Sequence, residues 1–275
     1  MNNFDKNKVK LQNVILMIAK EIVKLCDENN IPYFINGGTQ LGAIRHKGFI
    51  PWDDDFDIGM LRADYEKFLK VCEEQLDYNK YFLQTEDTEK YYAFNFAKIQ
   101  LKGTCIIEDF SKNVQIEHGI FVDIFPYDNI PDKAMKRRFF FMYNHILKNL
   151  LWIKCGYGDD TQKNAISYKC MLFISHFFSI ERLKKRRKQL MNQYNNQITK
   201  NCITSDYPGD ILKNEWFEDF VKYKFEDVEF LGFKKYDEYL KNLYGDYMKI
   251  PKESDRVTHS NYDIDFGVYD SLLEE

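Results

Sequence analysis

The sequence lacks several features that would assign a protein at once to a compartment or a partner. Its six cysteines are scattered and form no Cys-x-x-Cys pair, so a reduced compartment is indicated rather than a disulfide framework or a zinc site. Basic residues are not in excess, because the net charge is −4 and the pI about 5.8, which argues against nucleic acid as a partner.

Long apolar runs are also missing. A bilayer-spanning helix needs roughly 18 apolar residues, and the longest run, Cys170 to Ile180, has 11 and contains Ser175 and His176. Residues 1–10 are polar and charged, without the apolar centre of a signal peptide. We therefore expect a cytoplasmic protein, with peripheral contact at the inner face of the membrane left open.

The chain has enough apolar residues for a sizeable core. Hydrophobic residues make up 44% and aromatic residues 16% of 275 positions, so an ordered protein is expected. Apolar spacing predicts helices over 4–29, 40–46, 63–76, most of 132–200 and 237–244. Strands are predicted at 33–35, 55–58, 91–107, 114–125 and 228–233, with an irregular tail from 252.

These elements predict an α+β fold, a mixed β-sheet flanked by helices. We divide the chain into a catalytic core with an N-terminal helix (1–131), a helical, aromatic and basic region (132–200), and a C-terminal region (201–275) that packs back on the core. No internal repeat or low-complexity linker interrupts this plan.

The most informative stretch is an acidic cluster between apolar residues. Four acids occupy five positions from Asp53 to Asp57, and such crowding predicts a divalent cation, Mg²⁺ with Mn²⁺ as the alternative. Asp55 and Asp57 are two residues apart, so on a strand both side chains point to one face. Asp123 lies in the apolar run 121–125, where a carboxylate is costly to bury unless paired or metal-bound, and we expect it to complete the site.

A glycine pair precedes the acids. Gly37 and Gly38 would let the backbone approach an anionic ligand closely, and Thr39 is a good N-cap for the helix predicted next. The start of that helix would aim free N–H groups at a phosphate. Arg45, His46 and Lys47 follow two turns later and could balance phosphate charge.

Simpler interpretations remain open for these residues. The acids could form a solvated turn, and the basic triplet an ordinary helix end. Asp53-x-Asp55-x-Asp57 also resembles the start of a calcium loop, but Ile58 and Asp64 stand where glycine and glutamate are required. The glycine pair is not a P-loop, since no Gly-Lys-Ser/Thr follows it.

Together these motifs resemble one family. The block from Gly37 to Gly59 is similar to the LicD family of phosphocholine transferases, which shares a nucleotidyltransferase-like core with fukutin and fukutin-related protein. The resemblance continues through 118–126, 244–248 and 256–259. It implies that Asp55, Asp57 and Asp123 hold Mg²⁺, that Asp123 or Asp53 accepts the acceptor's proton, and that Arg256 and His259 are candidates for contacting the donor.

The resemblance also implies the reaction. A glycan hydroxyl attacks the phosphorus of a CDP-activated donor such as CDP-choline, CMP leaves, and a phosphodiester-linked group remains on a lipopolysaccharide, teichoic acid or capsule. Phosphoethanolamine, glycerol phosphate, a phosphonate or a sugar phosphate are alternative groups, and an inactive nucleotide- or glycan-binding protein is the alternative from another class. Choline would favour an aromatic cage, which the sequence cannot locate.

Two basic clusters flank the aromatic helices of the middle region. One has four cations within 133–138, the other six within 182–188, and apolar residues separate them. Basic clusters beside amphipathic helices are typical of proteins that bind membrane surfaces, and a lipid-linked acceptor would suit that location. Helices that simply pack on the core are the equal alternative.

Overall fold

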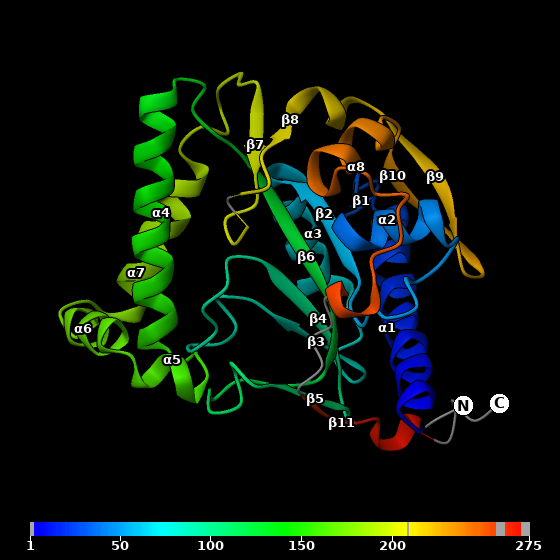
Figure 1. The fold of residues 1–275 in the computed structure, drawn as a ribbon, viewed down its shortest axis with the longest axis horizontal. Coiled ribbons are helices and arrows are strands. Elements are labelled where there is room, and N and C mark those ends of the chain that lie inside the picture. Colours follow the sequence, from blue (N-terminus) through cyan, green and yellow to red (C-terminus); the bar gives the residue numbers. More distant parts are fainter. Residues whose placement is uncertain (1–2, 208, 257–261, 271–275) are drawn as a thin grey trace.

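The computed structural model, which describes residues 3–207, 209–256 and 262–270, is built around a mixed β-sheet (Figure 1). Its strands follow the order β1-β2-β6-β4-β3, and β7 pairs with the end of β6 and with β8. The strands are β1 Phe34–Ile35, β2 Asp57–Leu61, β3 Tyr81–Gln84, β4 Ala97–Leu101, β6 Ile120–Asn129, β7 Asn201–Ile203 and β8 Leu212–Lys213. Only β2 and β6 run parallel among these pairs, so the predicted α+β fold with a mixed sheet is confirmed.

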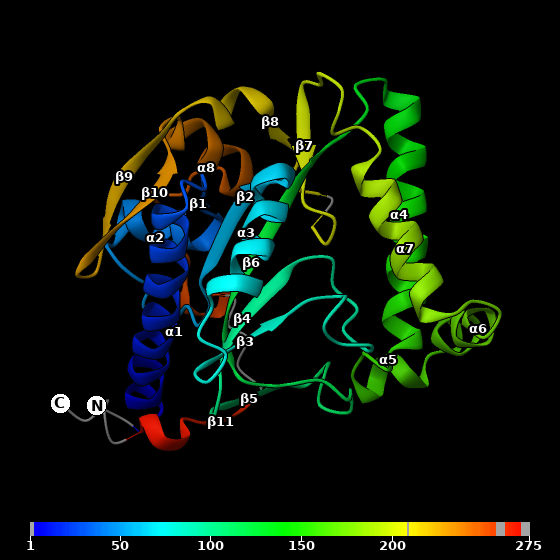
Figure 2. The ribbon, with the colours of Figure 1, turned by 180° about the vertical axis from the view of Figure 1, so that it is seen from behind.

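Two helices cover one face of this sheet. Figure 2 shows α1 (Asn3–Glu28) and α3 (Arg62–Gln75) in front of the strands. Both helices were predicted at these positions in the sequence. Apolar residues of α1 such as Ile18 and Ile22 are fully buried against Ile58 of β2 and Ile124 of β6 in one core. Because strand side chains alternate, the neighbours of these isoleucines face the opposite side of the sheet.

The opposite side carries shorter elements from both ends of the chain. They are α2 (Gly37–Arg45), the hairpin of β9 (Phe220–Phe225) and β10 (Val228–Phe233), and α8 (Tyr236–Tyr244), with short 3₁₀ helices at Asn214–Glu218, Glu253–Asp255 and Gly267–Tyr269. The predictions of β10 and α8 are confirmed. The strand β9, which pairs antiparallel with β10, was not predicted. Lysines alternate with aromatic residues in β9, a pattern that suits a strand with one exposed face.

The middle of the chain is helical, as predicted. The helices α4 (Ala134–Lys154), α5 (Asp160–Asn164), α6 (Ile166–Ser175) and α7 (Ile180–Asn192) stand beside the sheet, on the side away from β9 (Figure 1). A second core of α4, α7 and neighbouring loops includes Leu147, Leu183 and Met191. No helix in the described ranges is long and apolar enough to cross a membrane.

Two strand predictions were wrong in extent, and the prediction of an irregular tail was wrong in part. The stretch 91–107 is not one strand but β4 and β5 (Cys105–Glu108), separated by a turn in which Gly103 has a φ of 78°. The stretch 114–125 contributes only from Ile120 onward, and β6 then continues past Pro126 to Asn129. The tail is not wholly irregular, because β11 (Tyr262–Asp265) pairs with β5, a contact between residues too distant in sequence for local pattern to show.

Candidate active site

Neighbouring parallel strands bring two of the predicted acids together. The register of β2 and β6 sets Asp57 directly opposite Asp123, with Ile58 opposite Ile124. The isoleucines are fully buried in the core with α1, so alternation places both aspartates on the other face of the sheet. The carboxylates therefore meet across adjacent strands although 66 positions separate them in the sequence.

Asp55 reaches this site from a loop. The strand predicted for 55–58 begins only at Asp57. Residues 53–56 precede it without the regular backbone hydrogen bonds of a strand. The first contact with β6 is a hydrogen bond of 3.2 Å from the Asp123 amide to the Phe56 carbonyl. Asp53, Asp55 and Asp57 nonetheless all line one cavity. Asp54 does not line it and is buried, which contradicts a solvated turn at that position.

The helix after the glycine pair starts earlier than predicted. α2 begins at Gly37, with Asn36 as N-cap, rather than after Thr39. The Thr39 hydroxyl is used differently, since its Oγ1 accepts a 2.9 Å hydrogen bond from the Asp57 amide and ties α2 to β2. The Asn36 Oδ1 accepts hydrogen bonds from Tyr127 and Tyr239 at 2.9 and 2.6 Å, so the start of α2 is held by side chains from β6 and α8.

The two glycines leave room for the acids at the start of α2. Gly37 has a φ of 50°, and a Cβ built there would lie 3.4 Å from the Tyr244 hydroxyl and 3.7 Å from the Asp57 Oδ2. A Cβ on Gly38 would lie 3.1 Å from the Asp53 Oδ2. Two carboxylates thus lie close to the positive end of a helix dipole, which partly offsets their mutual repulsion.

Repulsion and burial both act on the acids that face each other. Burial raises the pKa of Asp57 well above its usual range, and the charges of Asp55, Asp123 and Asp53 raise it further. Burial also raises the pKa of Asp123, to about 7, with Lys98 acting in the opposite direction. A nearby cation would lower these raised pKa values again and stabilise the charged carboxylates.

Lys98 is a site residue that the sequence analysis missed. It pairs with Asp123 across β4 and β6, and its Nζ lies 3.4 Å from the Asp123 Oδ1 and 3.2 Å from the centre of the Phe121 ring. The ammonium group is buried although it carries a charge. The available signal was a lysine between Ala97 and Ile99 in a predicted strand, where a buried charged side chain is unusual.

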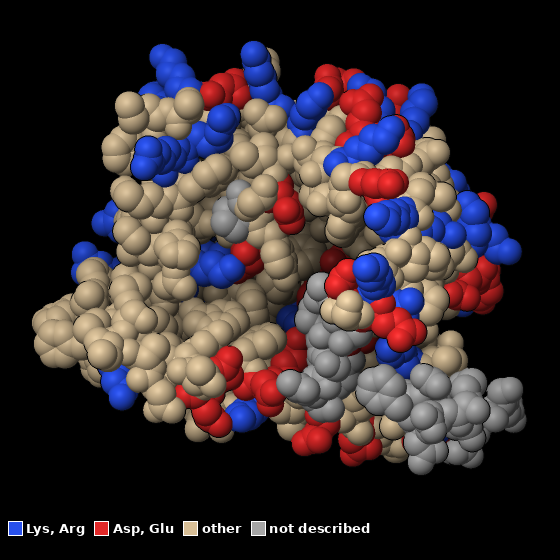
Figure 3. Space-filling model, in the orientation of Figure 1, with Lys and Arg blue, Asp and Glu red and all other residues tan. Residues whose placement is uncertain are grey.

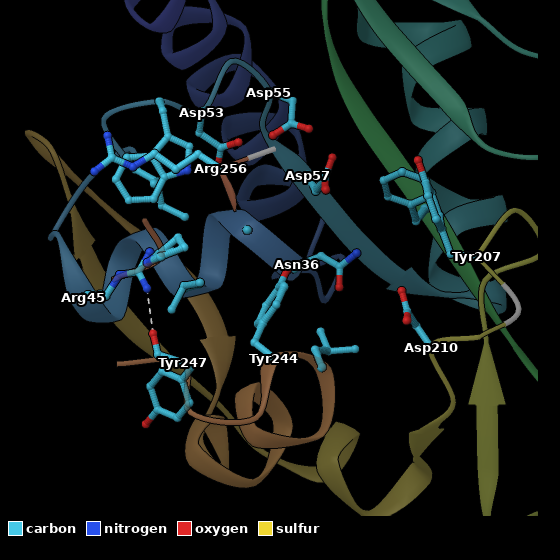
Figure 4. Close-up of a pocket in the computed structure, with 18 of the residues that line it drawn as sticks. Asn36, Arg45, Asp53, Asp55, Asp57, Tyr207, Asp210, Tyr244, Tyr247 and Arg256 are labelled. Atoms are coloured by element: carbon cyan, nitrogen blue, oxygen red, sulfur yellow. Dashed lines mark hydrogen bonds between the residues drawn. The ribbon is translucent and has the colours of Figure 1, made fainter. Parts of the chain in front are cut away.

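The acids open into a cavity of about 510 Å³. In the space-filling view a hollow separates the α4 side of the molecule from the α8 side (Figure 3). Figure 4 shows Asp53, Asp55 and Asp57 on its upper rim, with Arg45 and Arg256 on one side and Tyr207 and Asp210 on the other. The acidic group thus lies between a cationic end and an end with an aromatic ring and a carboxylate.

The cationic end is organised around Trp52. The Arg256 guanidinium carbon lies 4.3 Å and that of Arg45 5.9 Å from the centre of its ring. Arg45 is fixed by a 2.7 Å hydrogen bond to the Tyr247 carbonyl. Arg256 lines the cavity, its Nη1 lies 3.7 Å from the Glu253 Oε1, and its Nε is buried without a hydrogen-bond partner among the described residues. Burial lowers the pKa of Arg45, and Asp53 opposes the shift.

Other predicted residues lie elsewhere. His46 does not line the cavity, and its Nε2 accepts a 2.9 Å hydrogen bond from the Arg45 Nε. Lys47 is exposed outside the cavity, and its carbonyl accepts a hydrogen bond from the Glu226 amide. His259 lies outside the described residues. Tyr207 and Asp210, by contrast, line the cavity but belong to a turn-like stretch without a motif that could have marked them.

The acids fit a hard divalent cation in their chemistry. Carboxylate oxygens are the ligands that Mg²⁺ prefers, and the Asp123 Oδ1 is buried with only the 3.4 Å Lys98 contact, outside hydrogen-bond geometry. Within residues 3–207, 209–256 and 262–270, no three His, Cys, Asp or Glu side chains already form a ligand set. A bound cation would therefore have to draw these carboxylates closer together.

Comparison with known proteins places these features in one family. A family model described as LicD/FKTN/FKRP, nucleotidyltransferase domain, matches residues 30–154. This range contains Asp53, Asp55, Asp57, Asp123 and Lys98. The chain is 34% identical to lipopolysaccharide cholinephosphotransferase LicD of Haemophilus influenzae, over 90% of this chain and 94% of that protein.

More distant relatives share shorter segments. An uncharacterised protein of Rickettsia prowazekii is 33% identical over 52% of this chain and 47% of its own length. The human ribitol 5-phosphate transferase FKRP is 39% identical, but over only 17% of this chain and 9% of its own. The long match to a LicD protein is decisive, and the chain belongs to the LicD family.

Proposed function

We propose that this LicD-family transferase moves phosphocholine from CDP-choline to a hydroxyl of a cell-surface glycan such as a lipopolysaccharide, with Mg²⁺ as cofactor and CMP as the leaving group. The observation that carries the proposal is the cavity in which three aspartates lie between a cationic end and an aromatic, acidic end. The named activity of the Haemophilus influenzae relative supports the same reaction class. Mn²⁺ is the alternative metal.

In this proposal, Asp55, Asp57 and Asp123 hold the metal ion, which supplies positive charge to the phosphate oxygens of the donor. Phosphoryl transfer depends mainly on positioning and charge neutralisation, so these are the tasks the site must perform. Asp53 is our choice for accepting the proton of the acceptor hydroxyl, because it lines the cavity whereas Asp123 does not. Asp123 is the alternative base.

The two ends of the cavity suit the two ends of the donor. Arg45 and Arg256 can donate hydrogen bonds to diphosphate oxygens, and Trp52 offers a flat face beside them. At the other end, Tyr207 and Asp210 offer an aromatic face and a carboxylate to a cationic alcohol. An arrangement of this kind favours choline over neutral groups such as glycerol or ribitol.

The test measures CMP release from CDP-choline, CDP-ethanolamine, CDP-glycerol and CDP-ribitol with a glycan extract as acceptor, in Mg²⁺ and in EDTA. We expect metal-dependent CMP from CDP-choline, reduced on the order of 10²-fold or more in Asp57→Asn, since even outer partners of metal ligands contribute 10- to 100-fold. The matched control is Asp227→Asn, an exposed acid paired with Lys20, which should keep its activity.

Each other outcome has a distinct meaning. Preference for another CDP-alcohol would replace choline but keep the reaction class. CMP release that survives EDTA would refute the metal, and equal activity in Asp57→Asn would refute the site. No CMP from any donor, with CDP-choline binding retained in calorimetry, would favour the binding-protein alternative.

A further inference from the structure

The most apolar helix of the middle region is exposed instead of buried. In α6, with sequence Ile-Ser-Tyr-Lys-Cys-Met-Leu-Phe-Ile-Ser, Ser175 alone is buried. Ile166 is 81% exposed, Phe173 68%, and Phe177, just beyond the helix, 71%. A soluble helix normally turns its apolar side chains to the core and its polar ones to water, whereas α6 leaves most of its apolar side chains exposed.

A second set of exposed apolar residues lies on α4. Met135, Phe139, Met142, Tyr143 and Ile146 recur at intervals of three or four residues and therefore share one side of the helix. Met135 is 70% and Phe139 59% exposed. This stripe borders a groove of about 490 Å³ that is closed on its other side by Leu190 and Tyr194 at the end of α7.

The stripe and α6 form one continuous surface. The next positions on this side of α4, at the same spacing, are Leu150 and Lys154. The Lys154 Nζ donates a 3.0 Å hydrogen bond to the Ser175 carbonyl of α6. Thus α6 rests on the side of α4 that carries the stripe. Figures 1 and 2 show α6 at the outer edge of the molecule, far from β9, and Figure 3 shows this edge largely without charged residues.

Charge is distributed unevenly around this surface. Residues 132–200 contain 15 basic and 4 acidic residues, a net charge of +11, whereas the rest of the chain carries −15. Part of the 182–188 cluster is directed inward: Lys184 donates hydrogen bonds to the Glu86 and Glu89 carbonyls, and Arg187 is buried against Asp206. The exposed cations of this region are Lys133, Lys136, Arg138, Lys169, Arg182, Lys185, Arg186 and Lys200.

We propose that the α4 stripe and α6 together bind the surface of an anionic bilayer. The apolar side chains would enter the boundary between headgroups and acyl chains, and the exposed cations would contact anionic headgroups. The combination selects this occupant, because a partner that only buries apolar area would not account for eight exposed basic residues against three exposed acids within 132–200. The inference does not depend on the identity of the donor.

The experiment is co-sedimentation of the full chain with vesicles of phosphatidylcholine alone and of phosphatidylcholine with 25% phosphatidylglycerol. We expect binding to the anionic vesicles that weakens as salt increases. Phe173→Ser combined with Phe177→Ser should reduce binding at least tenfold, and Lys185→Glu combined with Arg186→Glu should reduce it on the order of fivefold per charge removed. These side chains are exposed, so their replacement should leave unfolding unchanged.

Matched controls lie on the opposite side of the molecule. Lys222→Glu with Lys224→Glu changes two exposed lysines of β9, and Val268→Ser changes an exposed apolar residue, so both should bind as the wild type does. Equal loss in the controls, or no binding of the wild type, would overturn the proposal. So would a dimer in light scattering that becomes monomeric in the phenylalanine variant, because a second copy would then cover the surface. CMP release in solution reports on the proposed function separately.

Discussion

A buried arginine in the second basic cluster allows the sharpest prediction about stability. Arg187 is 1% exposed, and its Nη2 lies 2.8 Å from the Oδ1 of Asp206, which is 4% exposed. The same guanidinium donates to the Asn144 Oδ1 at 3.3 Å and to the Ala93 carbonyl at 3.2 Å. One side chain thus connects α7 with α4, with the segment before β4 and with the segment after β7.

Arg187→Met removes the charge while keeping a long apolar side chain, and it leaves the Asp206 carboxylate buried without its main partner. Breaking a buried ion pair costs about 3–5 kcal/mol of unfolding free energy. Lys148, whose Nζ lies 4.0 Å from the Asp206 Oδ1, compensates in part, so we expect about 3 kcal/mol. For a chain of this size that corresponds to a decrease in Tm of about 6–12 °C.

The comparison uses Arg186→Met, the exposed neighbour, which should change stability by less than about 0.5 kcal/mol. Circular dichroism during heating and in urea measures both variants. If the unfolding free energies of Arg187→Met and Arg186→Met differ by less than about 1 kcal/mol, the argument that the Arg187–Asp206 pair stabilises the fold is refuted.

The pH dependence adds a second check on the same pair. Burial alone would raise the pKa of Asp206, but Arg187, then Lys148 and hydrogen bonds, outweigh it and hold the pKa below its ordinary value. A depressed pKa contributes stability above the unfolded-state value of about 3.9 and loses it as the pH falls through the folded-state value. The deficit of Arg187→Met should therefore be full at neutral pH and shrink below about pH 4.

Three further predictions concern the site and the thiols. Gly37→Ala should weaken CDP-choline binding in calorimetry more than Gly156→Ala. Both glycines have a positive φ, but of the two only Gly37 has site groups within 4 Å of an added Cβ. Equal effects would indicate backbone strain alone. Tyr239→Phe removes a hydrogen bond to Asn36 and the acceptor of the Gly37 amide, so it should cost about 1–3 kcal/mol of unfolding free energy in urea; no change would contradict it. Cys170 is the exposed cysteine among the described residues, so mass spectrometry after brief native alkylation should find it labelled first.

The sequence was sufficient for the part of the site that depends on local rules. Period-two alternation in a strand, combined with the cost of burying a carboxylate, predicted that Asp57 and Asp123 would share a site, and the register of β2 and β6 brings them together. The helices α1, α3 and α8 follow from apolar spacing alone. The roles of the acids in metal binding and proton transfer stay predictions.

What the sequence could not supply depends on contacts between distant segments. Lys98 matters because β4 lies next to β6, and Tyr207 matters because its turn returns to the cavity mouth. Helix α7 illustrates the same limit: Lys184 and Lys185 are adjacent and chemically identical, yet one is buried and the other exposed. Thr39 was assigned to the wrong task because its hydroxyl accepts a hydrogen bond from the Asp57 amide of β2, a contact that local sequence pattern does not reveal.

The strand order also has a consequence for synthesis of the chain. The central strand β6 follows both of its neighbours, β2 and β4, in the sequence, so the sheet has a gap until residue 129 has left the ribosome. During that interval Asp57 has only Asp53 and Asp55 as acidic neighbours at the site, and its repulsion with Asp123 arises when β6 closes the gap. Pairing between strands that are distant in sequence is slow. The edges of β2 and β4 therefore stay open until β6 has been made and has paired with both. Open strand edges can pair with strands of other chains, so aggregation is a hazard of this interval.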